Sequence, residues 1–244
     1  YLGYAIFFKE DQIYKVYGDR PSNFQVMSSA SLGVEAGSHL GLAIAGETLF
    51  YLTRAGIVAY SGGIPQSISD AFGTVRYHNA VAGSDGLKYY VSMQDDDGAW
   101  SLFVYDTRRG IWEREDETEA VGFAWNADLY FLGADGKLWL NGQPRSVPEG
   151  ATEESTVQSM VEFGEFVEND PNKKGTTKFQ ARISIDAGAS VTFWIMFDSS
   201  GTWEEIDTIE SNVLRSYVLP IIPRRNDHFK IKITGAGGWR LYSL

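Results

Sequence analysis

The stretch YYVSMQDDDGAWSLFVYD, residues 89–106, contains two strongly β-forming runs with three aspartates and a glycine between them. Asp-Gly is a favoured hairpin turn, because glycine takes a positive φ at little cost. A calcium loop of the EF-hand type would instead need acidic groups at alternate positions and a glutamate six residues beyond the glycine. Residue 104 is a valine inside the second run. We therefore expect a hairpin with its turn at Asp95–Gly98, and a calcium site is the less favoured alternative.

The same plan recurs along the first part of the chain. The segments 5–18, 48–62 and 128–142 each consist of an apolar run, a short polar or glycine-bearing turn and a second apolar run. With 89–106, their turns are spaced by roughly 40 residues, a period typical of β-propeller blades. The segments 26–46 and 72–86 are expected to supply the remaining strands of each blade.

A different pattern begins near residue 148. Residues 179–185 and 228–233 alternate between apolar and polar positions, and residues 191–197 carry the same period-two apolar set at positions 191, 193, 195 and 197. Such alternation in short strands predicts a small antiparallel sandwich. The sequence thus predicts an all-β chain in three parts. These are a partial or open propeller-like region of about three and a half blades at 1–148, a linker at 149–158 and a β-sandwich at 159–244. Because the chain starts inside a strand pattern, we expect it to be an excerpt of a longer protein.

Composition narrows the possible functions. The chain has 244 residues, no cysteine and a formal net charge of −11. Without cysteine there is no disulfide framework, so stability must come from packing. An acidic chain is a poor candidate for sequence-specific binding of nucleic acid, although DNA could pass near an acidic wall without adhering. No apolar run approaches the length of a membrane-spanning helix, so we expect no membrane partner.

The sequence shows no catalytic or metal-binding motif. The histidines His39, His78 and His228 stand alone, without a second ligand at the spacing of a metal-binding helix. There is no nucleophile elbow, and the loop at 169–177 lacks the Gly-Lys-Ser/Thr order of a phosphate loop. We therefore predict a non-enzymatic protein with no catalytic residue, cofactor or metal. The acidic residues at 112–120 leave a polysaccharide-degrading enzyme as a weaker alternative.

Four residues of the C-terminal part are candidates for contact with a partner protein. Trp194 and Met196 lie between Phe193, Ile195 and Phe197, so both faces of this strand are apolar. The strand is either central and covered, or it presents a contact face. Arg224 and Arg225 form either a solvated loop or a basic contact for acidic neighbours.

Tryptophans raise the possibility of a glycan-binding module. Trp203 and Trp239 follow glycine-containing turns, and they serve either as a carbohydrate platform or as packing at strand ends. The remaining tryptophans within the repeats are expected to pack in the repeat cores, namely Trp100, Trp112, Trp125 and Trp139.

Three segments resemble a known family. FFKEDQIYKVYGDRPSNFQV (7–26), TLFYLTRAGIVAYSGGIPQSISD (48–70) and SYVLPIIPRRNDHFKIKITGAGGWRLYSL (216–244) resemble segments of tailed-bacteriophage virion proteins of the packaged-DNA stabilisation or tail-nozzle kind. The resemblance implies a β-propeller-like structural protein at the head–tail junction or in the tail. Such proteins assemble with other virion proteins, as rings around the DNA exit path, and do no covalent chemistry. The resemblance further implies that the protein is assembled in the bacterial host cytoplasm and ends up in the virion. It assigns no functional residue to this chain.

Overall fold

The computed structural model describes residues 1–141, 149–151, 158–167, 174–176 and 178–244. Most of the expected linker at 149–158 and of the loop at 169–177 therefore lies outside the described residues. The described chain is all-β, as predicted, with antiparallel strand pairing and two single-turn 3₁₀ helices. Neither helix is long and apolar enough to cross a membrane. The chain divides into two compact units, Tyr1–Ala151 and Thr152–Leu244.

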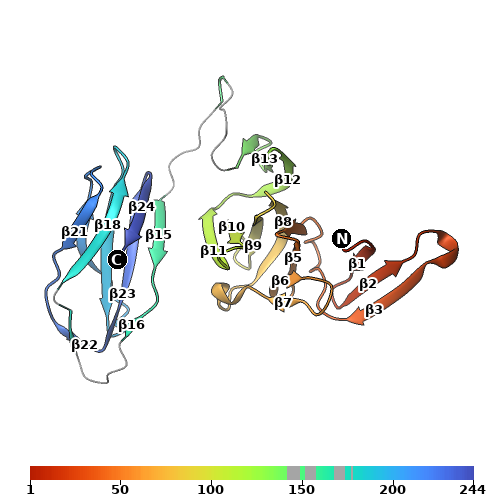
Figure 1. The fold of residues 1–244 in the computed structure, drawn as a ribbon, viewed down its shortest axis with the longest axis horizontal. Coiled ribbons are helices and arrows are strands. Elements are labelled where there is room, and N and C mark those ends of the chain that lie inside the picture. Colours follow the sequence, from red (N-terminus) through yellow and green to blue (C-terminus); the bar gives the residue numbers. More distant parts are fainter. Residues whose placement is uncertain (142–148, 152–157, 168–173, 177) are drawn as a thin grey trace. The chain divides into compact units, whose positions relative to one another are not determined.

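The first unit contains four antiparallel sheets that follow one another in chain order (Figure 1). Sheet 1 is formed by β1 (Ala5–Phe8), β2 (Gln12–Tyr17) and β3 (Gln25–Ala30). Sheet 2 is formed by β4 (Ala43–Ala45), β5 (Thr48–Thr53), β6 (Gly56–Tyr60) and β7 (Gln66–Ser67). Sheet 3 is formed by β8 (Tyr77–Ser84), β9 (Lys88–Asp95), β10 (Trp100–Asp106) and β11 (Ile111–Asp116). Sheet 4 is formed by β12 (Ala120–Asn126), β13 (Asp128–Gly133) and β14 (Leu138–Leu140). None of them closes on itself within the described residues.

The expected hairpins are all present. Strands β9 and β10 pair with Trp100 opposite Gln94. The Asp95 carboxylate accepts the backbone N–H groups of Asp97 at 3.0 Å and Ala99 at 2.8 Å, and Gly98 has a φ of +86°. Such short-range bonding is what makes aspartate a turn residue. The prediction of a turn at 95–98 is confirmed, as are the hairpins β1–β2, β5–β6 and β13–β14.

The 3₁₀ helices lie in two of the connections. Helix η1 (Pro21–Asn23) connects β2 to β3, where the Asn23 side chain accepts the backbone N–H groups of Asp19 and Arg20. Helix η2 (Asp70–Phe72) lies between β7 and β8.

Side-chain alternation along the strands explains why the sheets stack. On β5, Tyr51 packs with Ile13 of sheet 1, whereas Phe50 on the opposite face packs with Tyr89 of sheet 3. On β9, the next residue, Tyr90, packs with Leu129 of sheet 4. Successive residues of a strand point to opposite faces. The two central sheets are therefore covered on both faces, which explains why residues 49–53 of β5 and residues 89–93 of β9 are all buried.

The terminal sheets are different, because only one face of each packs within the unit. Sheet 1 turns Ile6, Phe8 and Ile13 toward sheet 2. The strand register places Ala5, Phe7, Tyr14, Val16 and Val26 on its outer face, together with Gln12, Ser28 and Ala30. Sheet 4 turns Phe123 and Leu129 toward sheet 3. The strand register places Ala124, Tyr130, Leu132, Leu138 and Leu140 on its outer face, together with the polar pair Asn126 and Asp128 at one end.

The second unit is built from two larger sheets and a short pair. One sheet contains β15 (Gln158–Glu162), β16 (Phe166–Val167), β19 (Ser190–Phe197), β20 (Glu204–Ile209) and β23 (His228–Ala236). The other contains β18 (Phe179–Ile185), β21 (Arg215–Leu219) and β24 (Trp239–Ser243), and β17 (Lys174–Gly175) pairs with β22 (Arg225–Asn226). Phe193 and Ile231 of the first sheet share one core cluster with Ala181 and Ile183 of the second.

The expectation that the repeat tryptophans pack in cores is right for Trp112 and wrong for Trp125. Trp112 packs in the cluster between sheets 2 and 3, and its indole N–H donates to the Ile68 carbonyl at 2.6 Å. Trp125 is 62% exposed. It pairs with Leu129 in the β12–β13 hairpin, although Leu129 itself is buried against Tyr90 and Val104 of sheet 3.

The packing of sheet 3 on sheet 4 predicts a strong effect at Gly83 in β8. A Cβ atom there would lie 2.4 Å from the Cβ of Phe123. We expect Gly83→Ala to lower the free energy of unfolding by about 1–3 kcal/mol, because the sheets must move apart. Urea denaturation measures this, with Gly122→Ala as the matched control, since a Cβ at Gly122 meets no atom within 4 Å. Equal effects of the two changes would contradict the close packing.

Candidate functional site

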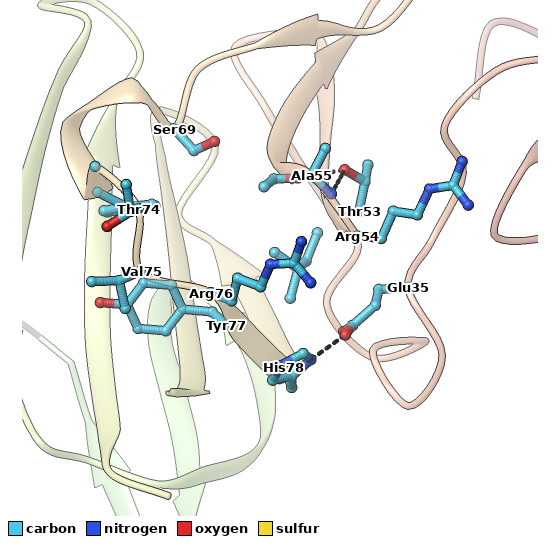
Figure 2. Close-up of a pocket in the computed structure, with 14 residues that line it drawn as sticks. Glu35, Thr53, Arg54, Ala55, Ser69, Thr74, Val75, Arg76, Tyr77 and His78 are labelled. Atoms are coloured by element: carbon cyan, nitrogen blue, oxygen red, sulfur yellow. Dashed lines mark hydrogen bonds and ion pairs between the residues drawn. The ribbon is translucent and has the colours of Figure 1, made fainter. Parts of the chain in front are cut away.

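A pocket of about 240 Å³ lies in the first unit, between the β5–β6 turn and the segment that leads into β8 (Figure 2). Thr53, Arg54, Ala55 and Gly56 of the turn line one side. The other side is lined by Ser69 and by residues 72–78, and Glu35 lies at the edge. Three segments distant in sequence thus form one concave site.

The conformation of the turn is fixed by its own hydrogen bonds. The Thr53 hydroxyl donates to the Gly56 carbonyl at 2.7 Å and accepts the Ala55 N–H at 3.1 Å. Gly56 has a φ of +118°, and a Cβ atom there would lie 2.2 Å from Ser69 Oγ. Only glycine fits this position, for both conformational and steric reasons.

His78 is the centre of a polar network at the edge of the pocket. Its Nδ1 bonds to the Glu35 carboxylate, and its Nε2 lies 2.8 Å from Asp96 Oδ1. The Glu35 carboxylate also accepts the Ser38 hydroxyl at 2.8 Å, and Ser38 Oγ accepts the Ala80 N–H at 3.0 Å. The network ties the connection before β4 to β8 and to the β9–β10 turn.

The two carboxylates control the charge of His78. Hydrogen bonding to Glu35, and then to Asp96, raises the pKa of His78, because both partners favour the protonated ring. Protonated histidine donates from both ring nitrogens, which matches its two acceptors. The Glu35 side chain is only 11% exposed, so its charge is balanced locally by His78. The arrangement can hold a proton and fasten the connection before β4. Among the described residues, no group of three or more metal-ligating side chains is arranged to hold an ion.

Sequence reasoning missed this network. Glu35 and Asp96 lie 43 and 18 residues from His78, and Asp96 was expected only to form a turn. No local spacing marks such a set, because the folding of separate repeats brings its members together. A lone histidine and a turn aspartate were the visible signals, and both are common in surface loops.

The expected contact residues of the second unit lie in different environments. Trp194 is half-buried, and its indole N–H donates to Thr234 Oγ1 at 2.9 Å. Met196 is only 8% exposed, so it is covered within its own unit and does not present a contact face. Arg224 lies 3.7 Å from the Phe197 ring centroid and 2.5 Å from Glu204 Oε1, whereas Arg225 is exposed on β22.

The two expected glycan-platform residues have different neighbours. The Lys232 amine lies 4.5 Å from the centroid of the Trp203 ring and 5.4 Å from that of Trp194. Trp239 packs against the core cluster of its unit, and its indole N–H donates to Ser159 Oγ at 2.8 Å. Trp203 therefore shares a cation with Trp194, and Trp239 has a packing role.

Comparisons with known proteins give little guidance. No family model and no curated protein matches the sequence. A solved structure described as a glycoside hydrolase is similar at a TM-score of 0.27 and 10% identity, over 98% of this chain and 81% of that one. An exo-β-1,3-galactanase from Phanerochaete chrysosporium is similar at a TM-score of 0.20 and 10% identity, over 98% of this chain and 95% of that one. Likenesses this weak assign neither a fold nor an activity to the chain.

The His78 network predicts a pH dependence of stability. The pKa of His78 in the folded state lies above its ordinary value of 6.5. Its stabilising effect is therefore complete below about pH 6.5 and is lost as the pH rises through the raised pKa. We expect this effect to be at most about 1 kcal/mol, since the site is partly exposed to solvent.

The measurement is the free energy of unfolding of wild type and His78→Gln between about pH 5 and pH 9. The advantage of wild type should shrink as the pH rises. His39→Gln is the control, because His39 is exposed and lies outside the network. A difference between wild type and His78→Gln that stays constant with pH would contradict the role of the protonated ring.

Proposed function

We propose that this chain is a non-enzymatic assembly protein that binds other protein chains through the outer faces of sheets 1 and 4. The exposure of these apolar faces is the observation that carries the proposal. Phe7 and Val26 are 60% and 64% exposed on sheet 1, and Leu132 and Leu138 are 39% and 69% exposed on sheet 4. Contiguous apolar surface on a folded unit is a feature of interaction sites.

The packing within the unit suggests a second copy of the chain as the partner. Each internal interface joins the apolar faces of two consecutive sheets. Sheet 4 of one copy would pack on sheet 1 of the next copy in the same way. Each outer face also carries one charged group, since the Lys9 amine lies 5.5 Å from the Tyr14 ring centroid on sheet 1 and the strand register places Asp128 on the outer side of sheet 4. These two charges are opposite in sign, so they do not oppose contact between the two faces. A contact between two different faces is heterologous, and it generates a ring if the rotation closes.

In this proposal, the four sheets are consecutive blades of an open propeller, and the second unit is a β-sandwich. Support for the propeller comes from the repeat of about 40 residues and from the stacking of sheets in chain order. Support for the sandwich comes from one core cluster shared by two antiparallel sheets. An open arrangement of blades would be completed by neighbouring copies.

We assign this assembly role to the virion of a tailed bacteriophage, on the strength of the sequence resemblance. The ring would lie at the head–tail junction or in the tail and would contact other virion proteins. An acidic ring around a DNA path would let DNA slide without adhering, since like charges repel.

The second unit would supply further contacts. Trp194, Arg224 and Arg225 remain the proposed contact residues there; the two arginines are exposed, and Trp194 is half-buried. The alternative of glycan binding through Trp203 or Trp239 has less support, because Lys232 lies over the Trp203 ring and Trp239 packs on the core.

Two single substitutions test the heterologous contact. Phe7→Asp should block the outer face of sheet 1, and Leu138→Asp should block that of sheet 4, because each places a charge in an apolar contact. We expect each variant alone to be monomeric, and an equal mixture to form dimers only, joined through the two intact faces. Analytical ultracentrifugation distinguishes these species.

The control for this experiment is Ile64→Asp, which changes an apolar residue that is 79% exposed and belongs to neither outer face. It should assemble as wild type does. Loss of folding in a variant would appear in its circular dichroism. If the wild-type chain stays monomeric at a protein concentration of about 100 μM, well above the Kd of standard interfaces, the proposal is contradicted.

A further inference from the structure

The pocket beside the β5–β6 turn has a basic lining in an acidic chain. Among the described residues that line it, Arg54, Arg76 and His78 are basic and Glu35 is acidic. The Glu35 carboxylate is already bonded to His78 and Ser38. The chain as a whole carries a net charge of −11, so the charge of the pocket lining is opposite in sign to that of the chain.

The two arginines of the pocket have no counter-ion within the described chain. Elsewhere in the first unit, Arg20, Arg109 and Arg114 each form an ion pair with a nearby carboxylate. Neither Arg54 nor Arg76 forms a hydrogen bond or an ion pair with any described residue. Figure 2 shows Arg76 extending its guanidinium into the space between its own segment and the turn.

Ser69 supplies a second hydrogen-bond donor to the pocket. Its hydroxyl makes no hydrogen bond to another described residue, and the oxygen keeps contact with solvent although the residue as a whole is only 8% exposed. Ser69 lines the same pocket as Arg76, so one acceptor placed there could satisfy both donors.

The remaining walls indicate what else the ligand contains. Leu52, Phe72 and Val75 contribute apolar surface to the pocket. Its volume of about 240 Å³ lies below the range of roughly 300–1,000 Å³ that holds drug-sized ligands. A small molecule with one acidic end and a compact apolar body fits this lining.

We propose that this pocket binds a small organic oxyanion, with Arg76 and Ser69 holding the carboxylate or phosphate oxygens and Phe72 and Val75 contacting the apolar part. Guanidinium groups bind both kinds of oxyanion through paired, charge-assisted hydrogen bonds. Arg54 lines the pocket from the turn, but its guanidinium is directed away from Arg76 (Figure 2). This function is separate from assembly, because the pocket residues belong to neither outer face.

The test uses three probes in isothermal titration calorimetry with the full chain: benzoate, phenyl phosphate and inorganic phosphate. We expect saturable binding of at least one aromatic probe, tighter than that of inorganic phosphate. A preference for benzoate assigns the site to carboxylates, and a preference for phenyl phosphate assigns it to phosphate esters. Arg76→Gln should weaken the preferred probe about tenfold or more, as expected for the loss of a charged hydrogen-bond donor.

Two controls keep the result specific. Arg108→Gln removes an exposed arginine outside the pocket and should change the affinity less than about twofold, the range of a distant surface charge. Ser69→Ala should weaken binding without removing any charge. If none of the three probes shows saturable binding at concentrations up to about 10 mM, which is above the Kd expected of a functional ligand, the proposal is overturned. Equal weakening by Arg76→Gln and Arg108→Gln would overturn it as well.

Discussion

The alternation of side chains along a β-strand is the constraint on which the first unit depends. A strand that buries consecutive residues must be covered on both faces, and β5 and β9 are such strands, with residues 49–53 and 89–93 all buried. Sheet 2 is therefore held between sheets 1 and 3, and sheet 3 between sheets 2 and 4. The same rule leaves the terminal sheets with one covered and one uncovered apolar face, and the proposed assembly follows from that asymmetry.

The stacking also creates the pocket. Sheets 2 and 3 pack through their apolar centres, whereas the β5–β6 turn and the segment before β8 lie at the rim of that contact. Polar and basic groups gather there, and His78 joins the two sides through Glu35. Assembly and ligand binding would thus use different parts of one architecture, the outer faces of the stack and a rim between two inner sheets.

The sequence predicted the repeating hairpins because turn chemistry and apolar runs are local signals. Asp95 and Gly98 formed the expected turn, and its sister hairpins appeared where the repeat placed them. Long-range consequences were not visible in the same way. The partners of His78 come from separate repeats, and Trp125 is exposed although its strand partner Leu129 is buried. Which face of a strand is covered, and how far, depends on tertiary packing.

The most direct test of the central claim uses the absence of cysteine from the chain. A variant with Val26→Cys and Leu138→Cys places one thiol on each outer face, and disulfides form only between closely apposed residues. Mild oxidation should yield a ladder of covalent oligomers on a non-reducing gel, and an equal mixture of the two single variants should yield dimers. Cross-linking no greater than that of a Val26→Cys and Ile64→Cys pair would contradict the packing of sheet 4 of one copy on sheet 1 of the next.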